Sequence, residues 1–339
     1  MEPREEPESA APPRVTVAIP ASNAEAFLGE TLDSVIAQSY RDWEAVITDD
    51  ASSDHTFDLA QRYAKEHPER IRVVRLERVD GTAAARNAAI EASSGGELIA
   101  LLDHDDRWRS DYLEHMVSRY DNAVESGRRV GLVACNAILE APNGRLRTFD
   151  EECGWADPVT YAGMIERSTI FAGALFPRAV FDEVGGLAPE CWGADDYDLW
   201  LRILERGYDV VLTREPLVIY RQHEDNLSRN QLRMSEAAIC AYRRALERPY
   251  ATGAQRRLLR KRLRHYRALR ARALALEAFE GQRPLAALPL ALRAVPIGLI
   301  AFVQEPRRWR EWLVDLLATR RAPSERSVER QRATARAEP

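Results

Sequence analysis

The chain of 339 residues lacks the patterns of several large protein classes. It contains neither a G-x-G-x-x-G nor a G-x-x-x-x-G-K-[ST] stretch, so the glycine-rich phosphate loops of dinucleotide-dependent oxidoreductases and P-loop enzymes are missing. Residues 1–14 are acidic and proline-rich, unlike a secretory signal peptide, which combines a basic end with an apolar segment. We expect a disordered tail there.

Cysteine is scarce. The four cysteines, Cys135, Cys153, Cys191 and Cys240, are far apart in the sequence and form no C-x-x-C pair. This spacing argues against a zinc site and against a disulfide framework. We expect reduced thiols, as in a cytosolic protein.

Long apolar runs are also scarce. Only residues 284–303 are apolar over a length that suits a membrane span, and Arg293, Pro284, Pro289 and Pro296 interrupt them. A central arginine costs roughly 2.5–3.5 kcal/mol on membrane insertion scales. We therefore expect this stretch to lie on a membrane or on the domain rather than to span a bilayer.

The net charge of −5 conceals an asymmetry. Residues 231–339 hold 24 basic and 10 acidic side chains, whereas residues 1–230 hold 24 basic and 43 acidic ones. The basic region favours an anionic membrane surface as partner. Packing of the basic helices on the acidic domain is the main alternative, and no nucleic-acid partner is expected because no recognised nucleic-acid motif accompanies the arginines. The expected location is cytoplasmic, at the inner face of the cell membrane.

The first hundred residues alternate between strand-like and helix-like segments. Strands separated by helices of this length imply right-handed βαβ units and parallel strands. The expected strands are 15–20, 43–50, 71–77 and 97–103, and the expected helices are 24–38, 55–66 and 82–93.

The second half is less regular. After about residue 230 the pattern is helical only, with a basic amphipathic surface over 256–280. Before that, the expected strands are 130–139, 168–177, 208–213 and 216–223, and the expected helix is 195–207.

Acidic side chains follow two of the expected parallel strands. Asp49 and Asp50 end one strand, and Asp103, Asp105 and Asp106 follow another. Ligands of such sheets bind beyond the carboxyl ends of the strands. Clustered carboxylates suggest Mg²⁺ or Mn²⁺, and a cation with few protein ligands usually completes its shell with water and substrate phosphates. A bare D-x-D more often caps a helix or lies in a solvated loop, but the apolar strand before it and the second acidic strand end favour a site.

At this point a family resemblance becomes visible. Residues 15–228 resemble the family 2 inverting glycosyltransferases of the GT-A fold, because eight weak motifs occur in that family's order. They are VAIPASN (17–23), LDSVIAQSY (32–40), WEAVITDDASSDHT (43–56), GTAAARN (81–87), LLDHDDRW (101–108), the pair Gly185-Gly186 with DDYDLWLR (195–202), GYDVV (207–211) and YRQH (220–223).

The resemblance implies an α/β fold. The expected GT-A domain is a Rossmann-like mixed sheet with flanking helices over 15–228, with a nucleotide-binding half (15–106) and an acceptor half (107–228). A basic helical extension follows over 229–339, and we expect it to associate with a membrane.

The resemblance also implies roles for individual residues. Asp50 matches the acid that reads the nucleotide base, Asp103 and Asp105 match the D-x-D pair, and Asp196 matches the catalytic base. The full expected set is Pro20, Asp50, Arg86 and Asp103 for the nucleotide sugar, Asp105 and His223 for a divalent metal (Mn²⁺ or Mg²⁺), Asp196 for catalysis, and Trp192 and Asp195 on the acceptor side.

Each assignment has a structural alternative. Asp50 could cap the following helix, Arg86 could pair with a surface acid, and Asp196 could serve only the dipole of its helix. Trp200, like Trp192, is of a type found more often in a core than on a sugar platform. The chain also departs from the family's pattern: Ser22 stands where tyrosine is frequent, and Ala51 replaces a usual glycine.

The expected activity is transfer of a sugar from a nucleotide-diphosphate donor, with a UDP-sugar favoured, to a hydroxyl of a growing glycan or lipid-linked acceptor. Inversion requires one displacement, a base for the acceptor proton and a metal on the leaving diphosphate. A degenerate, non-catalytic partner protein that binds nucleotide or membrane is the alternative. A metal-dependent phosphatase or nucleotidyltransferase would explain the D-x-D but not the acidic start of 195–207.

Overall fold

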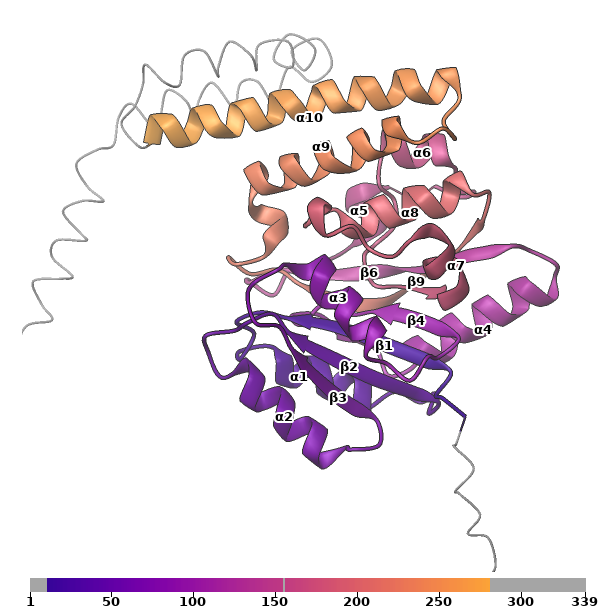
Figure 1. Cartoon of the computed structure of the whole chain (residues 1–339), viewed down its shortest axis with the longest axis vertical. Coiled ribbons are helices and arrows are strands. Elements are labelled where there is room, and N and C mark those ends of the chain that lie inside the picture. The colour runs from indigo at the N-terminus through magenta and orange to yellow at the C-terminus, as the bar shows by residue number, and fades with distance from the viewer. Residues whose placement is uncertain (1–10, 155, 281–339) are drawn as a thin grey trace, which may run out of the picture. The chain divides into compact units, whose positions relative to one another are not determined.

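A computed structural model describes residues 11–154 and 156–280, and in this part of the chain it shows one mixed nine-stranded sheet with helices on both faces (Figure 1). Most of the tail expected over 1–14, and all of the apolar stretch 284–303, lie outside the described residues. Arg14 is described and is anchored, because its guanidinium donates to Glu97 (2.8 Å) and Asp121 (2.5 Å).

The strand order along the sheet is β3-β2-β1-β4-β8-β6-β9-β5, and β7 pairs with β6 beside this path. The first four strands in the sequence are parallel to one another, and β8 joins them in antiparallel orientation. The strands are β1 (Val15–Ala21), β2 (Trp43–Asp49), β3 (Ile71–Arg75), β4 (Leu98–Leu101), β5 (Arg107–Trp108), β6 (Val130–Glu140), β7 (Leu146–Thr148), β8 (Ala174–Pro177) and β9 (Asp209–Arg221).

Four helices fall within the segments expected at 24–38, 55–66, 82–93 and 195–207, and the region after about 230 is helical as expected, whereas the four helices between residues 112 and 184 were not predicted. Short 3₁₀ turns, η1 (Pro189–Cys191) and η2 (Leu227–Arg229), precede the two helices that border the acceptor half. The α-helices are α1 (Leu28–Ile36), α2 (Thr56–Glu66), α3 (Thr82–Glu91), α4 (Tyr112–Glu125), α5 (Phe149–Cys153), α6 (Tyr161–Glu166), α7 (Arg178–Val184), α8 (Asp195–Glu205), α9 (Gln231–Glu247) and α10 (Gly253–Glu280).

Two of the strand predictions were wrong in detail. Of the strand expected over 168–177, only Ala174–Pro177 is β-structure. The two strands expected at 208–213 and 216–223 form the single strand β9, whose pairing with β6 shifts register near Cys135 and Asn136. The pairing passes from Cys135 with Thr213 to Asn136 with Pro216, so β9 continues through the two residues that lay between the two expected strands.

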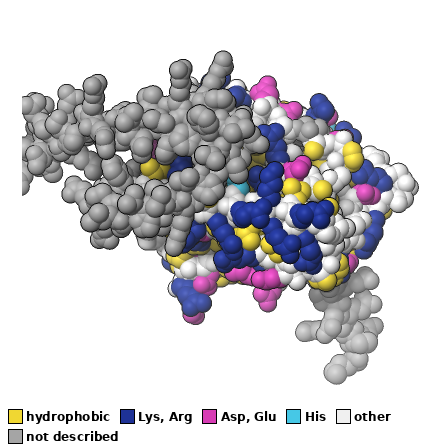
Figure 2. Space-filling view, turned by 90° about the horizontal axis from the view of Figure 1, so that it is seen from above, with side chains coloured by type: hydrophobic (Ala, Val, Ile, Leu, Met, Phe, Trp, Pro, Cys, Tyr) yellow, Lys and Arg dark blue, Asp and Glu magenta, His cyan; other side chains and the backbone are white. Residues whose placement is uncertain are grey.

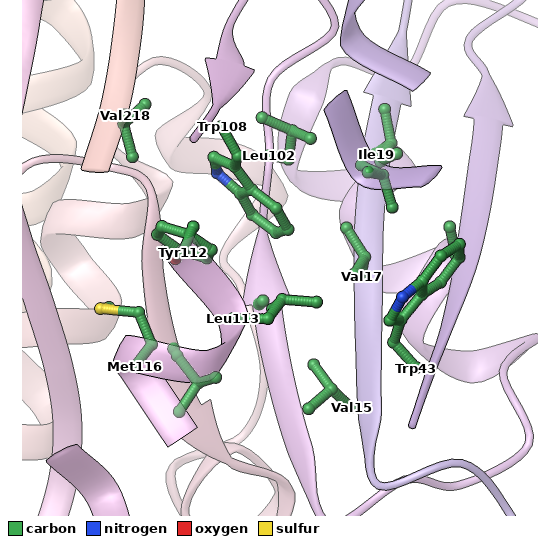
Figure 3. Close-up of a cluster of buried hydrophobic side chains, with 14 of the residues drawn as sticks. Val15, Val17, Ile19, Trp43, Leu102, Trp108, Tyr112, Leu113, Met116 and Val218 are labelled. Carbon is green, nitrogen blue, oxygen red and sulfur yellow. The ribbon is translucent and has the colours of Figure 1, made fainter. Parts of the chain in front are cut away.

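The central strands are buried on both faces, as parallel strands covered by helices must be. Along β1, Val15, Val17 and Ile19 join one apolar cluster, and the intervening Ala18 joins the other. Figure 3 shows the first cluster, in which Trp43 of β2 flanks β1 and side chains from Leu102 to Met116 pack from the other side. The rigid sheet this creates fixes the strand ends that carry the acidic residues.

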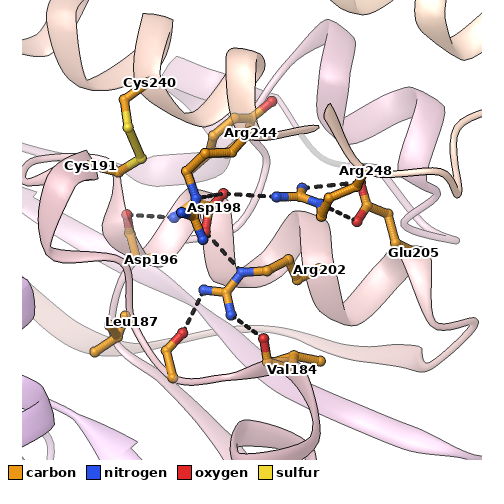
Figure 4. A network of polar contacts seen from close by, with 12 residues as sticks. Val184, Leu187, Cys191, Asp196, Asp198, Arg202, Glu205, Cys240, Arg244 and Arg248 are labelled. Carbon is orange, nitrogen blue, oxygen red and sulfur yellow. Dashed lines mark hydrogen bonds and ion pairs between the residues drawn. A yellow bond between two sulfur atoms is a disulfide. The ribbon is translucent and has the colours of Figure 1, made fainter. Parts of the chain in front are cut away.

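Helices α8 and α9 are joined by a buried ionic network around Asp198 (Figure 4). The Asp198 carboxylate is fully buried and accepts from Arg202 of its own helix (2.8 Å). It also accepts from Arg244 and Arg248 at the end of α9 (3.2 Å each), and Arg248 in turn binds Glu205. One acid thus holds three arginines from two helices.

The expectation that all cysteines are reduced was wrong. Cys191 and Cys240 form a disulfide between η1 and α9, with a sequence separation of 49 and a Cα–Cα distance of 5.4 Å (Figure 4). The pairing arises because η1 packs on α9, a contact that cysteine spacing does not reveal. Cys135 and Cys153 are free thiols.

The chain divides into two compact units, residues 1–266 and 267–339. The first unit therefore includes α9 and the first half of α10, beyond the boundary expected at residues 228/229. Leu259 and Leu263 of α10 belong to the same apolar cluster as Ile239 of α9. Among the described residues, no helix has the length and apolar character needed to cross a membrane.

Candidate active site

Asp50 follows β2 at the carboxyl edge of the sheet and holds a loop. Its two carboxylate oxygens accept the backbone N–H groups of Asp80 (2.8 Å) and Gly81 (2.9 Å), and its side chain is almost fully buried. It does not cap α2, because Asp54 takes the N–H of Thr56 at the start of that helix. Asp50 therefore ties the end of β2 to the loop before α3.

Arg86 of α3 connects two acids that are far apart in the sequence. Its guanidinium donates to Asp103 after β4 (2.5 Å) and to Asp195 at the start of α8 (2.8 Å). Burial lowers the pKa of Arg86, but the charges of Asp103 and Asp195 outweigh it and raise the pKa above its ordinary value. The arginine is a permanent cation at the junction of the two halves, and not a surface residue.

Asp105 and His223 come together although 118 residues separate them. His223 Nε2 lies 3.0 Å from Asp105 Oδ2, and the Asn226 amide donates to the same oxygen (3.1 Å). The imidazole stacks on Phe27, with ring centroids 4.5 Å apart. His223, predicted from the YRQH motif alone, thus lies beside the D-x-D sequence.

The other acids at the two strand ends have structural contacts. Asp49 is buried and forms an ion pair with Arg75 (3.2 Å). Asp106 accepts the backbone N–H of Arg221 (3.2 Å), and burial together with the charge of Asp105 raises its pKa well above the ordinary value. The contacts of these two acids link β2 to β3 and the segment after β4 to β9, next to Asp50 and Asp105.

Asp196 lies beside the Arg86 cluster, in the first turn of α8. One of its carboxylate oxygens accepts the backbone N–H of Tyr197 (2.7 Å). Burial, and next the charge of Asp195, raise the pKa of Asp196 to about 6, although Arg86 acts in the opposite direction. A carboxylate with a pKa near neutrality is suited to accept a proton from a hydroxyl group.

Asp195 is turned inward. Its side chain is 1% exposed, and its carboxylate accepts from Arg86 and from the backbone N–H of Gly193 (3.3 Å). The structure therefore gives Asp195 partners within the protein, and its expected place on the acceptor side stays a prediction. Its contact with Arg86 fixes the first turn of α8, on which Asp196 lies.

Trp192 packs on the loop that Asp50 holds. Its indole N–H donates to Thr82 Oγ1 (3.2 Å), and a methyl group added at Gly81 would lie 2.6 Å from the ring. Gly81 has φ +87°, so a glycine suits both the backbone and the close approach of the indole. The guanidinium of Arg233, at the start of α9, lies 3.9 Å from the centre of the indole ring.

Pro20, expected on the nucleotide side, is a buried residue of β1 whose carbonyl lies 3.0 Å from His104 Nδ1. Trp200 is buried in the core, in agreement with the structural interpretation of that residue. Sequence reasoning missed Phe27, Asn226 and Arg233. Only Asn226 had a signal, as a polar residue three positions after His223, whereas Phe27 and Arg233 come from helix starts without a motif.

The residues at the D-x-D edge fit a divalent cation. Asp105 offers a carboxylate oxygen and His223 an imidazole nitrogen 3.0 Å apart, a donor pair compatible with Mn²⁺. Within the described residues, no cluster of three or more His, Cys, Asp or Glu side chains could hold a metal ion.

Comparison with known proteins identifies the family. Residues 16–134 match the model of the family described as Glycosyl transferase family 2. A protein of Bacillus subtilis (strain 168), with the provisional name teichuronic acid biosynthesis glycosyltransferase TuaG, is 31% identical over 232 residues, which are 68% of this chain and 88% of TuaG. The chain belongs to glycosyltransferase family 2. Its assignment as a glycosyltransferase, made from eight weak motifs, is thereby confirmed.

One further relative by sequence and one solved structure extend the comparison. The Escherichia coli protein UDP-Glc:alpha-D-GlcNAc-diphosphoundecaprenol beta-1,3-glucosyltransferase WfgD is 36% identical over 104 residues, 31% of this chain and 40% of WfgD. The mannosyltransferase PcManGT from Pyrobaculum calidifontis, solved with GDP-Man and Mn²⁺, superposes with a TM-score of 0.57 at 24% identity over 91% of this chain and 86% of PcManGT. The predicted GT-A fold, a mixed sheet with flanking helices, is confirmed.

Proposed function

We propose that this family 2 glycosyltransferase moves a sugar from a nucleotide-diphosphate donor to an acceptor hydroxyl with inversion at the anomeric carbon. The observation that carries the proposal is the Asp103–Arg86–Asp195 cluster. Through Arg86, Asp103 after β4 is joined to the first turn of α8, which carries Asp196. In this proposal one part of the molecule binds the donor and another supplies the base, and the buried Arg86 connects the two parts.

In the proposed reaction, the acceptor hydroxyl attacks the anomeric carbon opposite the leaving nucleoside diphosphate. The new C–O bond forms as the bond to the diphosphate breaks, and Asp196 takes the hydroxyl proton. The elevated pKa of Asp196, about 6, supports this role. No covalent intermediate on the enzyme is required.

Asp105 and His223 would hold the divalent cation, which would stabilise the negative charge that develops on the leaving diphosphate. Asn226 and Phe27 fix these two side chains by a hydrogen bond and a ring stack. Asp50 and Gly81 would border the nucleotide, since they lie at the carboxyl edge of the parallel strands where ligands bind.

The proposed donor is a UDP-sugar. WfgD is named for UDP-Glc, which supports this choice. PcManGT was solved with GDP-Man, so the transfer assay below includes both uridine and guanosine nucleotides. The proposed acceptor is a growing cell-surface glycan or a lipid-linked sugar. TuaG is named for teichuronic acid biosynthesis and WfgD for a diphosphoundecaprenol-linked acceptor, which supports this class.

We further propose that the enzyme works at the inner face of the cell membrane, through α10. Arg257, Arg260, Lys261 and Arg264 are exposed, follow one helical face and form no ion pair with a described residue. The opposite face is anchored by Leu259, which is fully buried. Figure 2 shows Lys and Arg side chains gathered on the face seen from above. Each such cation near an anionic membrane is worth about 1 kcal/mol.

Vesicle sedimentation tests the membrane proposal. Replacing the four cations of α10 by glutamine should weaken binding to anionic phosphatidylglycerol vesicles at least about tenfold and leave the weak binding to neutral phosphatidylcholine vesicles unchanged. Equal binding of the wild type to both vesicle types would contradict it.

A transfer assay tests the catalytic proposal. The full chain, with Mn²⁺, a panel of UDP- and GDP-sugars and a GlcNAc-diphosphate lipid acceptor, should release one nucleoside diphosphate and form a product of inverted anomeric configuration by NMR. Asp196→Asn should reduce the rate by about 10²–10⁴ without changing nucleotide affinity. Asp182→Asn, an exposed acid of α7, is the matched control. Nucleotide binding without any transfer would favour the non-catalytic alternative.

A further inference from the structure

Arg233 is a cation without a carboxylate partner beside the candidate site. Among the described residues no acid forms an ion pair with it, and its guanidinium stacks on Trp192, 3.9 Å from the centre of the indole ring. Most other arginines of this region are paired; Arg244, on the same helix, binds Asp198 and Glu190. A half-buried, unpaired guanidinium at a site is a candidate ligand for an anion.

The stack fixes how Arg233 can act. A guanidinium on the face of an indole ring is held by cation–π attraction, and its N–H donors point outward in the plane of the group. These donors suit the oxygens of a phosphate, which arginine binds in a bidentate manner. Trp192 is itself fixed by Thr82 and Gly81, so Arg233 is held in a defined position.

Through Trp192, Arg233 lies near both the loop that Asp50 holds and the segment that leads into α8. On one side, Gly81 beneath the indole donates its N–H to Asp50, at the proposed nucleotide edge. On the other side, Trp192 begins the loop that leads to Asp196, the proposed base. A methyl group added at Gly193 of this loop would lie within 3.4–3.7 Å of Leu227, Met234 and Ala237, so the start of α9 packs on this loop.

We propose that Arg233, held on Trp192, binds a diphosphate group of a substrate. The inference rests on the proposed function and deepens it. Two substrates of the proposed reaction carry this chemistry: the nucleotide donor and an acceptor linked to a lipid through diphosphate. In either case Arg233 acts as a binding residue for a diphosphate group.

Calorimetry on the full chain distinguishes the sources. In the donor arm, UDP and UMP are titrated with Mn²⁺. In the acceptor arm, farnesyl diphosphate is titrated into protein already saturated with UDP and Mn²⁺. The variants are Arg233→Gln, the charge-preserving Arg233→Lys, and the control Arg243→Gln, which removes an exposed arginine further along α9.

A hydrogen-bonded charge pair predicts an affinity loss of about tenfold or more for Arg233→Gln, a smaller loss for Arg233→Lys and none for Arg243→Gln. Loss for UDP but not UMP supports the donor diphosphate, and loss for farnesyl diphosphate alone supports the acceptor diphosphate. Unchanged affinities in both arms overturn the inference while leaving nucleotide binding, and with it the proposed function, intact. A wild-type protein that binds no nucleotide would overturn both.

Discussion

Asp50 and Asp198 are both buried acids near the site, and they are held in different ways. Asp50 receives two backbone N–H groups from a loop 30 and 31 residues along the chain. Asp198 receives three arginine side chains, two of which come from a helix 46 and 50 residues away. Asp50 is thus held by the backbone of a neighbouring loop, whereas Asp198 depends on charged side chains from α8 and from the end of α9.

This difference determines which substitutions should destabilise each region. Backbone donors remain in place after most substitutions, because every residue except proline carries an N–H group. Charged side chains do not, and removal of one partner leaves the others buried without compensation. The acceptor half should therefore be the more sensitive half to single substitutions outside the site.

The largest stability effect is expected at Asp198. Asp198→Ala leaves Arg202 buried without its carboxylate and removes the contacts of Asp198 with Arg244 and Arg248, which should lower the free energy of unfolding by about 3–5 kcal/mol. Urea unfolding measures the loss. The control Asp209→Ala removes an exposed pair with Arg128 and should cost below about 1 kcal/mol. Similar losses in the two variants would contradict the comparison.

The disulfide is the next largest effect. It closes a loop with 49 residues of sequence separation, and removing such a crosslink typically costs about 2–4 kcal/mol. The Cys191→Ala/Cys240→Ala variant should unfold at lower urea than the wild type, and a reducing agent should bring the wild type toward the variant. Cys153→Ala, which removes a free thiol, is the control. If the reducing agent leaves the urea midpoints of the wild type and of Cys153→Ala unchanged, the crosslink does not contribute to stability.

The pH dependence of activity probes the acceptor half directly. Since the base must be ionised and the pKa of Asp196 is raised to about 6, kcat/KM should be constant above that pH. It should fall about tenfold per pH unit below it. Asp195, Asp103 and Arg86 are the charged groups that set this pKa. An acid limb near the ordinary aspartate pKa would show that Asp196 is not the base, or is not buried in solution.

The smallest expected effect on the free energy of unfolding is at Ala51, in the nucleotide-binding half expected from the sequence. Ala51 has φ +51°, a left-handed conformation that costs an L-residue about 1–2 kcal/mol. Part of the gain from glycine is offset by the greater freedom of glycine in the unfolded chain. Ala51→Gly should therefore raise the free energy of unfolding by about 0.5–1 kcal/mol, whereas Ala88→Gly inside α3 should lower it by about as much. A loss at both positions would contradict the strain at Ala51.

The nucleotide half was also the half most fully predicted from the sequence. Its strands and helices alternate over short distances, and the acids that end β2 and β4 are visible as motifs. The departure at Ala51, where the family usually has glycine, corresponds to a positive φ angle in the structure, so the residue pattern carried real backbone information.

The acceptor half was predicted less well for a physical reason. The Cys191–Cys240 disulfide, the arginines on Asp198 and the Arg233–Trp192 stack all join η1 or α8 to α9. Such contacts depend on how helices pack, and no local spacing encodes them. The motif DDYDLWLR did indicate Asp196 but not that Asp195 and Asp198, on either side of it, serve Arg86 and the α9 arginines.

The most direct test of the account is calorimetric titration of the full chain with UDP and GDP, in Mn²⁺ and in chelator, with the wild type and Asp105→Ala. The account predicts that one nucleotide, UDP in the proposal, binds only with the metal, and that Asp105→Ala loses this binding while keeping the wild-type unfolding midpoint. Metal-independent binding, or equal binding by Asp105→Ala, would contradict the assignment of Asp105 and His223 as the metal-holding pair.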